Sequence, residues 1–303
     1  MTEDDSGSLE QRTRRVFHSI HKEQLENSGQ LERTLQQSSL DHLGLEPGFF
    51  AGKECLEAGC GTFAPGSQNM LAAGAKSVTA MDLNATIHEF VPGLLAEYEG
   101  RYTLTVGDVL DLPFPDASFD FVLCDGVLHH TRDPLQGAAE LARVTRPGGT
   151  LFLTSFGKPG LMHKMAEVIR DQYAHDPETG ALIDELDASD FRGGLEWLAS
   201  VMSSQGDPLA EQVSVESAAQ LFDPDLVLTI KDRIQAPVYQ GISFSELEQV
   251  LAKAGCGALE RVKRYQSYAN IRQVLAPLYF HPEAKLARLL YGDGYLRVKA
   301  RKL

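Results

Sequence analysis

The stretch CLEAGCGTF, residues 55–63, decides the fold class of this chain. Its first residues form a short apolar run typical of a buried strand, and Gly59 and Gly61 allow the backbone to turn sharply and approach a ligand closely. Doubly wound sheets bind ligands at the carboxyl ends of their strands, which is where this turn falls. One glycine turn is weak evidence, so its meaning depends on the sequence around it.

Strands and helices alternate around this stretch. The apolar runs predict five strands, at Lys53–Ala58, Ser77–Leu83, Tyr102–Val106, Phe119–Cys124 and Thr150–Ser155. Helices are predicted between them, at Ser67–Ala73, Thr86–Tyr98 and Pro134–Val144. Asp133 before Pro134 is a typical helix start, and Arg146-Pro147-Gly148-Gly149 predicts a stop. The alternation predicts an α/β fold with a parallel, doubly wound, Rossmann-like sheet.

The rest of the chain divides into three segments around this core, which we place at residues 51–156. Residues 1–50 show helical spacing of apolar residues. Residues 157–240 contain helical stretches and no convincing strand, and are interpreted as a helical insertion. Residues 241–303 are predicted to complete the sheet. They contain a capped helix at Ser243–Ala254, strands at Leu259–Tyr265 and Tyr295–Ala300, and a helical excursion at 266–293.

Acidic residues recur at the predicted strand ends. Asp82 ends the second strand, where an acidic side chain either binds ribose hydroxyls or caps the next helix. Asp108 follows the third strand, where a carboxylate can accept a hydrogen bond from an adenine amine while Val109 lies against the ring. The fourth strand leads through Asp125 towards a pair of histidines. These positions predict a nucleoside-type ligand at one edge of the sheet.

LEAGCGT at 56–62, VLHH at 127–130 and RPGG at 146–149, taken together, resemble the class I S-adenosylmethionine (SAM)-dependent methyltransferases. The closest likeness is to the small-molecule branch that includes ubiquinone and menaquinone biosynthesis enzymes. It covers residues 50–156 well and 243–303 weakly. The resemblance implies a seven-stranded, mostly parallel sheet with one antiparallel strand near its end. It also implies SAM contacts at Glu57, Gly59, Gly61, Asp82, Leu83, Asp108, Val109, Asp125 and Val127.

By this resemblance Glu57, Gly59 and Gly61 contact the methionine part of SAM, Asp82 the ribose and Asp108 the adenine, while Asp125 and Val127 line the sulfonium. The chain departs from the family at Phe63, where a third glycine is usual. We expect Gly66 to take over the close packing in an altered turn. A Rossmann dehydrogenase is the main rival, but the acidic Glu57 suits the amino group of SAM better than a pyrophosphate.

Two histidines are the candidate catalytic residues. His129 and His130 follow the fourth strand, near the expected methyl position, and a histidine of near-neutral pKa suits a general base. The alternative is that they only shape the loop. Tyr173 and Tyr239 are weaker candidates. The insertion at 157–240 leaves from the end of the fifth strand, on the cofactor side, and is expected to form a lid with a mostly apolar pocket for a small acceptor, or alternatively a dimerisation element. Its apolar residues are expected to form a small core or to line the pocket, among them Met165, Trp197 and Phe222.

Composition narrows the function classes. A formal net charge of −14 disfavours nucleic acid as a partner, and the four scattered cysteines, without CxxC spacing, give no metal site. No apolar run is long enough to span a membrane, and the polar N-terminus favours a cytoplasmic location. We therefore expect a methyltransferase with a small-molecule acceptor, with a homodimer as one expected state. Alternatives are a catalytically inactive SAM-binding regulatory or scaffold protein, a nicotinamide-dependent oxidoreductase and a macromolecule methyltransferase.

Overall fold

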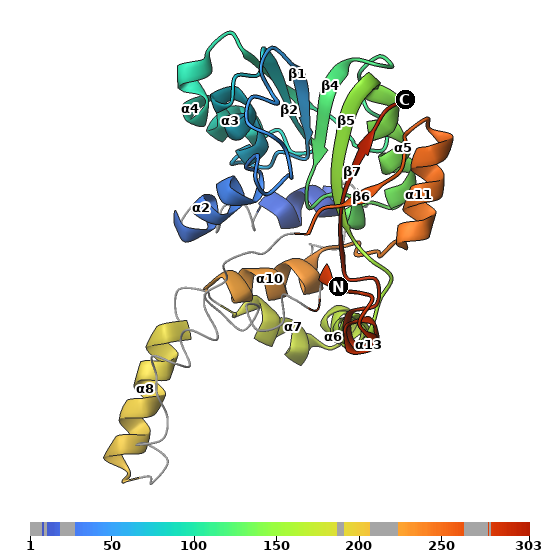
Figure 1. The fold of residues 1–303 in the computed structure, drawn as a ribbon. Helices are drawn as coiled ribbons and strands as arrows, with labels where there is room; N and C mark the ends of the chain where they lie inside the picture. The colour runs from blue at the N-terminus through green and yellow to red at the C-terminus, as the bar shows by residue number, and fades with distance from the viewer. Residues whose placement is uncertain are drawn as a thin grey trace.

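A seven-stranded sheet in the order β3-β2-β1-β4-β5-β7-β6 forms the core of the computed structural model (Figure 1). The structure describes residues 8, 11–18, 28–186, 191–206, 224–263, 278 and 280–303. The strands are β1 Glu54–Ala58, β2 Ser77–Asp82, β3 Tyr102–Val106, β4 Phe119–Cys124, β5 Thr145–Phe156, β6 Glu260–Arg261 and β7 Tyr295–Arg301. β7 alone runs in the direction opposite to the other six strands, which confirms the predicted seven-stranded sheet with one antiparallel strand.

Helices cover both faces of the sheet, and each face has its own apolar core. On one face α3 (Pro65–Ala72) and α4 (Ile87–Leu94) bury residues such as Met70 and Val91. On the other face α5 (Pro134–Val144) and α11 (Phe244–Lys253) bury residues such as Leu141 and Leu247. This two-faced burial explains why the central strands read as continuous apolar runs rather than as an alternating pattern.

The best-marked helix boundaries were predicted correctly. The side chain of Asp133 accepts a hydrogen bond from the backbone N–H of Gln136 at 3.0 Å, and α5 occupies its predicted range. In α11, Ser243 and Glu246 form the predicted capping box. Both signals depend on hydrogen bonds between residues three apart, which the local sequence determines.

The largest differences from the predicted boundaries concern three elements, while other boundaries shift by one or two residues. Strand β5 begins at Thr145 rather than Thr150, because Thr145 pairs with Phe119 and a register shift in β4 accommodates the Arg146–Gly149 stretch. The single helix predicted at Thr86–Tyr98 is α4 followed by a 3₁₀ turn, η2 (Ala96–Tyr98). In the last third of the chain, β6 has two residues where Leu259–Tyr265 was predicted, although 264 and 265 lie outside the described residues.

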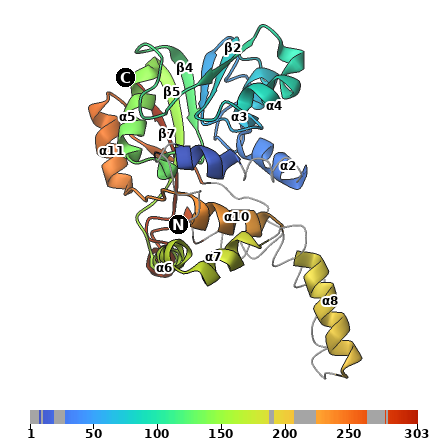
Figure 2. The same cartoon turned by 180° about the vertical axis from the view of Figure 1, so that it is seen from behind.

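The insertion packs at the end of the sheet where strands β1 to β4 terminate. Its helices are α6 (Leu161–His175), α7 (Pro177–Asp184), α8 (Phe191–Ser204) and α10 (Pro224–Gln235). Helix α6 packs against α7, α10 and α13 (Lys285–Tyr291), whereas α8 projects away from the rest of the chain (Figures 1 and 2). Helix α13 lies within the predicted 266–293 excursion, and Phe222 of the insertion lies outside the described residues.

Several apolar residues predicted to form an insertion core or pocket are instead exposed. They include Met165 on α6 and Trp197 on α8, which is 67% exposed. The predicted homodimer is one way of covering such residues and stays a prediction. None of the helices in the described ranges has the length and apolar character that crossing a bilayer requires.

Candidate cofactor and acceptor site

A cavity of about 380 Å³ lies at the carboxyl ends of β1 to β4. The predicted cofactor-binding residues all line it: Glu57, Gly59, Gly61, Asp82, Leu83, Asp108, Val109, Asp125 and Val127. Of the two candidate catalytic histidines, His130 lines the cavity and His129 does not. The volume is within the usual range for small-molecule sites. The structure thus brings the predicted residues together, while their contacts with a cofactor stay a prediction.

The turn after β1 requires glycine at its first position. Gly59 has a φ of +81°, and a Cβ built there would lie 2.1 Å from Cγ2 of Val127. The backbone N–H groups of Gly59 and Cys60 donate to the carbonyl of Met81 at 2.7 and 2.9 Å. Any other residue at position 59 would therefore be strained and would displace Val127, which faces the same cavity.

Close packing of the next helix falls on Gly66 instead of on residue 63. Phe63 is buried, and α3 begins two residues later at Pro65. A Cβ on Gly66 would lie 2.4 Å from Leu123 and 2.7 Å from a carboxylate oxygen of Glu57. The structure thus agrees with the expectation that Gly66 takes over the role of the missing third glycine.

The Glu57 carboxylate holds the N-terminus of α3 in place. It accepts hydrogen bonds from the backbone N–H groups of Gly66 (2.8 Å) and Ser67 (2.7 Å) and from the Ser67 hydroxyl (2.6 Å). Burial raises the pKa of Glu57 to about 7, and the hydrogen bonds from Ser67 and Gly66 oppose that rise. Glu57 therefore fixes the turn, whether or not it also contacts a ligand.

Backbone N–H groups orient the next two strand-end carboxylates. Asp82 accepts hydrogen bonds from Gly61 and Asn84, both at 2.9 Å, and Asp108 accepts one from Leu110 at 2.9 Å. Each carboxylate also lines the cavity. Asp82 thus connects the turn after β1 to the end of β2. This contact goes beyond the alternative role considered for Asp82, which was to cap the next helix.

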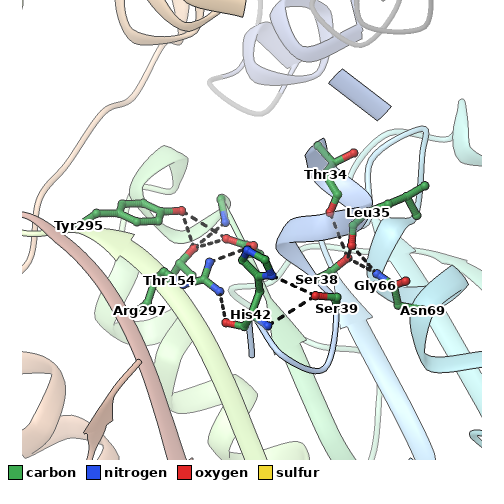
Figure 3. Close-up of polar contacts among 12 residues, drawn as sticks. Thr34, Leu35, Ser38, Ser39, His42, Gly66, Asn69, Thr154, Tyr295 and Arg297 are labelled. Atoms are coloured by element: carbon green, nitrogen blue, oxygen red, sulfur yellow. Dashed lines mark hydrogen bonds and ion pairs between the residues drawn. The ribbon is translucent and has the colours of Figure 1, made fainter. Parts of the chain in front are cut away.

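Asp125 belongs to a polar network that the sequence did not reveal, and Figure 3 shows three of its partners, Thr154, Tyr295 and Arg297. One of its oxygens, Oδ1, accepts hydrogen bonds from the Thr154 hydroxyl at 2.7 Å and the Tyr295 hydroxyl at 3.3 Å. The other, Oδ2, lies 3.7 Å from Nη1 of Arg297, whose side chain is fully buried. Arg297 donates through Nη2 to the carbonyl of His42 at 2.9 Å, so one guanidinium joins β7, the segment after α2 and the cavity wall.

Among the described residues, the N-terminal helical segments cover the cavity and the insertion does not. Residues 11–18 contribute Thr13, Arg14 and Phe17 to its lining, and α2 (Ser28–Gln37) with the residue after it contributes Thr34, Gln37 and Ser38. These segments lie between the sheet and α10 in both views (Figures 1 and 2). No described residue of 157–240 lines this cavity. The covering role that was predicted for the insertion therefore falls to the N-terminal segments.

One side-chain contact fastens α2 to the core. The side-chain amide of Asn69 on α3 donates to the Leu35 carbonyl at 2.7 Å and to the Ser38 hydroxyl at 2.8 Å (Figure 3). A second link runs from the side-chain amide of Asn84 to the carbonyl of Arg14 at 3.4 Å. The cover is therefore attached to the core at two points.

The two histidines differ in their surroundings. His129 is 3% exposed, burial lowers its pKa well below the ordinary value, and its Nδ1 has no hydrogen-bond partner among the described residues. In His130, Nδ1 lies 3.1 Å from the Val238 carbonyl and Nε2 lies 3.4 Å from Oδ1 of Asp232 on α10. Burial also lowers the pKa of His130, while Asp232 and the Val238 carbonyl oppose this. Only His130 therefore has both a cavity position and ring partners.

The two candidate tyrosines lie in different surroundings. Tyr239 does not line the cavity, but its ring lies 5.8 Å from that of His130, which does, and 5.0 Å from that of Phe156. Tyr173 donates its hydroxyl to Asp184 at 2.9 Å within the insertion and does not line the cavity. A tyrosine that the sequence reasoning missed, Tyr295, does line it.

Comparison with known proteins identifies the class of the core. Residues 56–153 match the family described as the methyltransferase domain. This part of the chain is therefore similar to methyltransferase domains, the class that the motifs in the sequence predict, with SAM as the expected cofactor. The four strand-end acids, Glu57, Asp82, Asp108 and Asp125, fit a cofactor that carries positive charge on its sulfonium and ammonium groups.

Individual relatives are similar over part of their length. A demethylmenaquinone methyltransferase of Beutenbergia cavernae is 32% identical over 134 residues, which cover 43% of this chain and 50% of the relative. A 27-O-demethylrifamycin SV methyltransferase of Amycolatopsis mediterranei is 33% identical over 126 residues, covering 40% and 46%. The chain thus spans about half the length of these curated relatives. A crystal structure of a SAM-dependent methyltransferase from Thermotoga maritima has a TM-score of 0.49 at 12% identity, covering 96% of this chain and 100% of that chain.

Proposed function

We propose that this chain is a SAM-dependent methyltransferase that methylates a small-molecule acceptor. The observation that carries the proposal is the single cavity in which all the predicted cofactor residues meet His130 and Tyr295. The names of the two relatives refer to demethylmenaquinone and 27-O-demethylrifamycin SV, which are both small molecules. A negative net charge and a cavity covered by helices also favour a small acceptor over a nucleic acid.

The cavity residues divide by role. Asp82 and Asp108 are placed to accept hydrogen bonds from the ribose and the adenine, and Glu57 holds the turn that would carry the methionine part. Asp125, held by Thr154 and Tyr295, is the carboxylate for the sulfonium side. When bound, SAM supplies an activated methyl group whose leaving sulfur keeps the electron pair of the broken bond. The enzyme's main task is then to position the acceptor.

The acceptor is proposed to enter beside His130. The rings of Phe17 and His130 line the cavity here with their centres 4.8 Å apart, and the ring of Tyr239 packs against His130 at 5.8 Å. His130 would take the acceptor's proton, whereas His129 would pack beneath it, 4.1 Å from its ring. The helical insertion would act as a lid on this side only, through α10 and the segment after it, while the N-terminal helices close the cofactor side.

Isotope transfer tests the proposal. Protein and methyl-labelled SAM are incubated with a panel of small phenols, quinols and amines, and both labelled product and S-adenosylhomocysteine are measured. Asp82→Ala should weaken SAM binding by about 1.5–3 kcal/mol, the range for charge-assisted hydrogen bonds. Calorimetry that shows tight SAM binding, with no acceptor in a broad panel giving turnover, would instead support the inactive SAM-binding scaffold.

A further inference from the structure

Helix α10 places one carboxylate against the proposed base. Asp232 has its Oδ1 3.4 Å from Nε2 of His130, and its side chain is 28% exposed while that of His130 is 7% exposed. The two residues come from different parts of the fold, because α10 belongs to the insertion and His130 to the turn after β4. The backbone N–H of Gln240 also donates to the His129 carbonyl at 2.8 Å, which fixes the chain after α10 against the same turn.

The ring nitrogens of His130 are oriented by acceptors on both sides. A carbonyl oxygen can only accept, so the contact with Val238 requires hydrogen on Nδ1. Nε2 then carries the lone pair in the neutral ring, and Oδ1 of Asp232 lies 3.4 Å from it. This contact becomes an ion pair only when Nε2 is protonated. The pocket around His130 is therefore complementary to the imidazolium form, although the neutral form predominates because of burial.

The other charged groups near His130 do not provide this complementarity. From α6, Arg170 lowers the pKa of His130, and its guanidinium is occupied by the carbonyls of Arg233 and Ala236 at 2.6 and 2.8 Å. His129 beside it has a pKa well below the ordinary value because it is buried. Phe17 and Tyr239 contribute ring contacts, and Arg14 on the helix of Phe17 lines the same cavity. Asp232 is the carboxylate that raises the pKa of His130.

We propose that Asp232 is the positioning residue of His130: it fixes the ring at the cavity wall and pairs with the imidazolium formed when His130 accepts the acceptor's proton. This role rests on the proposed methyl transfer. The proton moves from the acceptor atom to Nε2, and the acceptor keeps the electron pair that forms its bond to the methyl group. The Asp232–imidazolium pair persists until the proton is returned to solvent. The insertion thereby supplies a residue to the chemistry without lining the cofactor cavity.

Replacing Asp232 tests this role in two ways, one of which needs no turnover. In the protein without cofactor, the His130 imidazole is titrated by NMR in wild type, Asp232→Asn, Asp232→Glu and Asp171→Asn. Asp171→Asn is the matched control, because Asp171 also contacts a histidine of the insertion, His175 at 3.2 Å, but both are exposed. Asp232→Asn should lower the pKa of His130, Asp232→Glu should largely restore it, and Asp171→Asn should leave it unchanged.

Turnover gives the second readout. Asp232→Asn should lower the plateau of kcat by about 10- to 100-fold, which is no more than the decrease expected when a general base is removed. The affinity for SAM should change little. The acidic limb of the kcat profile should move to lower pH, because a less basic His130 stays neutral there. A merely structural role would lower kcat without moving this limb. An unchanged titration of His130 in Asp232→Asn overturns the proposal, even if no acceptor is found, while a shifted titration without turnover rejects only the methyltransferase function.

Discussion

Arg297 offers the sharpest test of how the cavity wall is held together. Its guanidinium is fully buried in β7, with one hydrogen bond to the His42 carbonyl and Asp125 at 3.7 Å. At an effective dielectric constant of about 20, two unit charges at that separation attract by about 4 kcal/mol. Arg297→Met removes the cation, preserves much of the side-chain volume and leaves Asp125 uncompensated. Removing one partner of a buried pair costs about 3–5 kcal/mol, so we expect a loss of stability of that size.

A double-mutant cycle measures the pair itself. Arg297→Met, Asp125→Asn and the combined variant are unfolded in urea and followed by circular dichroism. We expect the combined variant to be more stable than the sum of the two single losses by about 2 kcal/mol or more, because it contains no unpaired charge. Strictly additive losses would show that the two groups do not interact, and the network in Figure 3 would then lose its central link.

An exposed ion pair provides the control for this cycle. Lys164 and Glu167 on α6 are only 2.7 Å apart, closer than the buried pair, but their side chains are 62% and 53% exposed. Solvent screens such a pair, so the same cycle on Lys164→Met and Glu167→Gln should give a coupling too small to resolve. The comparison separates the effect of burial from that of distance.

Three further predictions follow from the cavity. Gly59→Ala should weaken SAM binding at least tenfold, as measured by calorimetry. Adding Val127→Ala should recover only part of the lost affinity, because alanine at the positive φ of position 59 stays strained. A Gly59→Ala variant that binds SAM as tightly as wild type would contradict this prediction. Because the pKa of Glu57 is raised to about 7 in the folded state, its stabilising contribution is complete below about pH 4.5 and lost as the pH rises through 7. Relative to Glu57→Gln, wild type should thus lose on the order of 3 kcal/mol of unfolding free energy between about pH 4.5 and pH 7. Parallel plots of unfolding free energy against pH for the two proteins would refute this prediction. His130→Gln should lower kcat by about 10²–10⁴ while His129→Gln has a smaller effect, and the reverse order would assign the base to His129.

Local signals in the sequence were sufficient to predict the sheet and the half of the cavity formed by the strand ends. The turn at Gly59, the carboxylates at the strand ends and the start of α5 at Asp133 each depend on residues within a few positions of one another. The parallel topology then brings the strand ends to one edge without further information. This is why the predicted cofactor residues line one cavity.

The other half of the cavity depends on contacts between distant segments. Nothing near Asp232 indicates that α10 will meet His130, and Arg297 reads as one more basic residue in a strand until His42 and Asp125 are seen beside it. The cover was predicted to come from the insertion because that segment leaves the sheet at the correct edge. The N-terminal helices reach the same edge and take that place, and helical periodicity alone does not determine which of two helical segments packs there.

The position of β7 between β5 and β6 has a consequence for how the chain is made. β5 emerges from the ribosome with one edge satisfied by β4, while the partner of its other edge, β7, is separated from it by the whole insertion. Until that strand arrives, Thr150–Phe156 presents unpaired backbone groups on a strongly apolar strand, which is the surface that neighbouring nascent chains can join. Arg297 and Tyr295 arrive on the same late strand, so the polar wall of the cavity is completed only when the edge is closed.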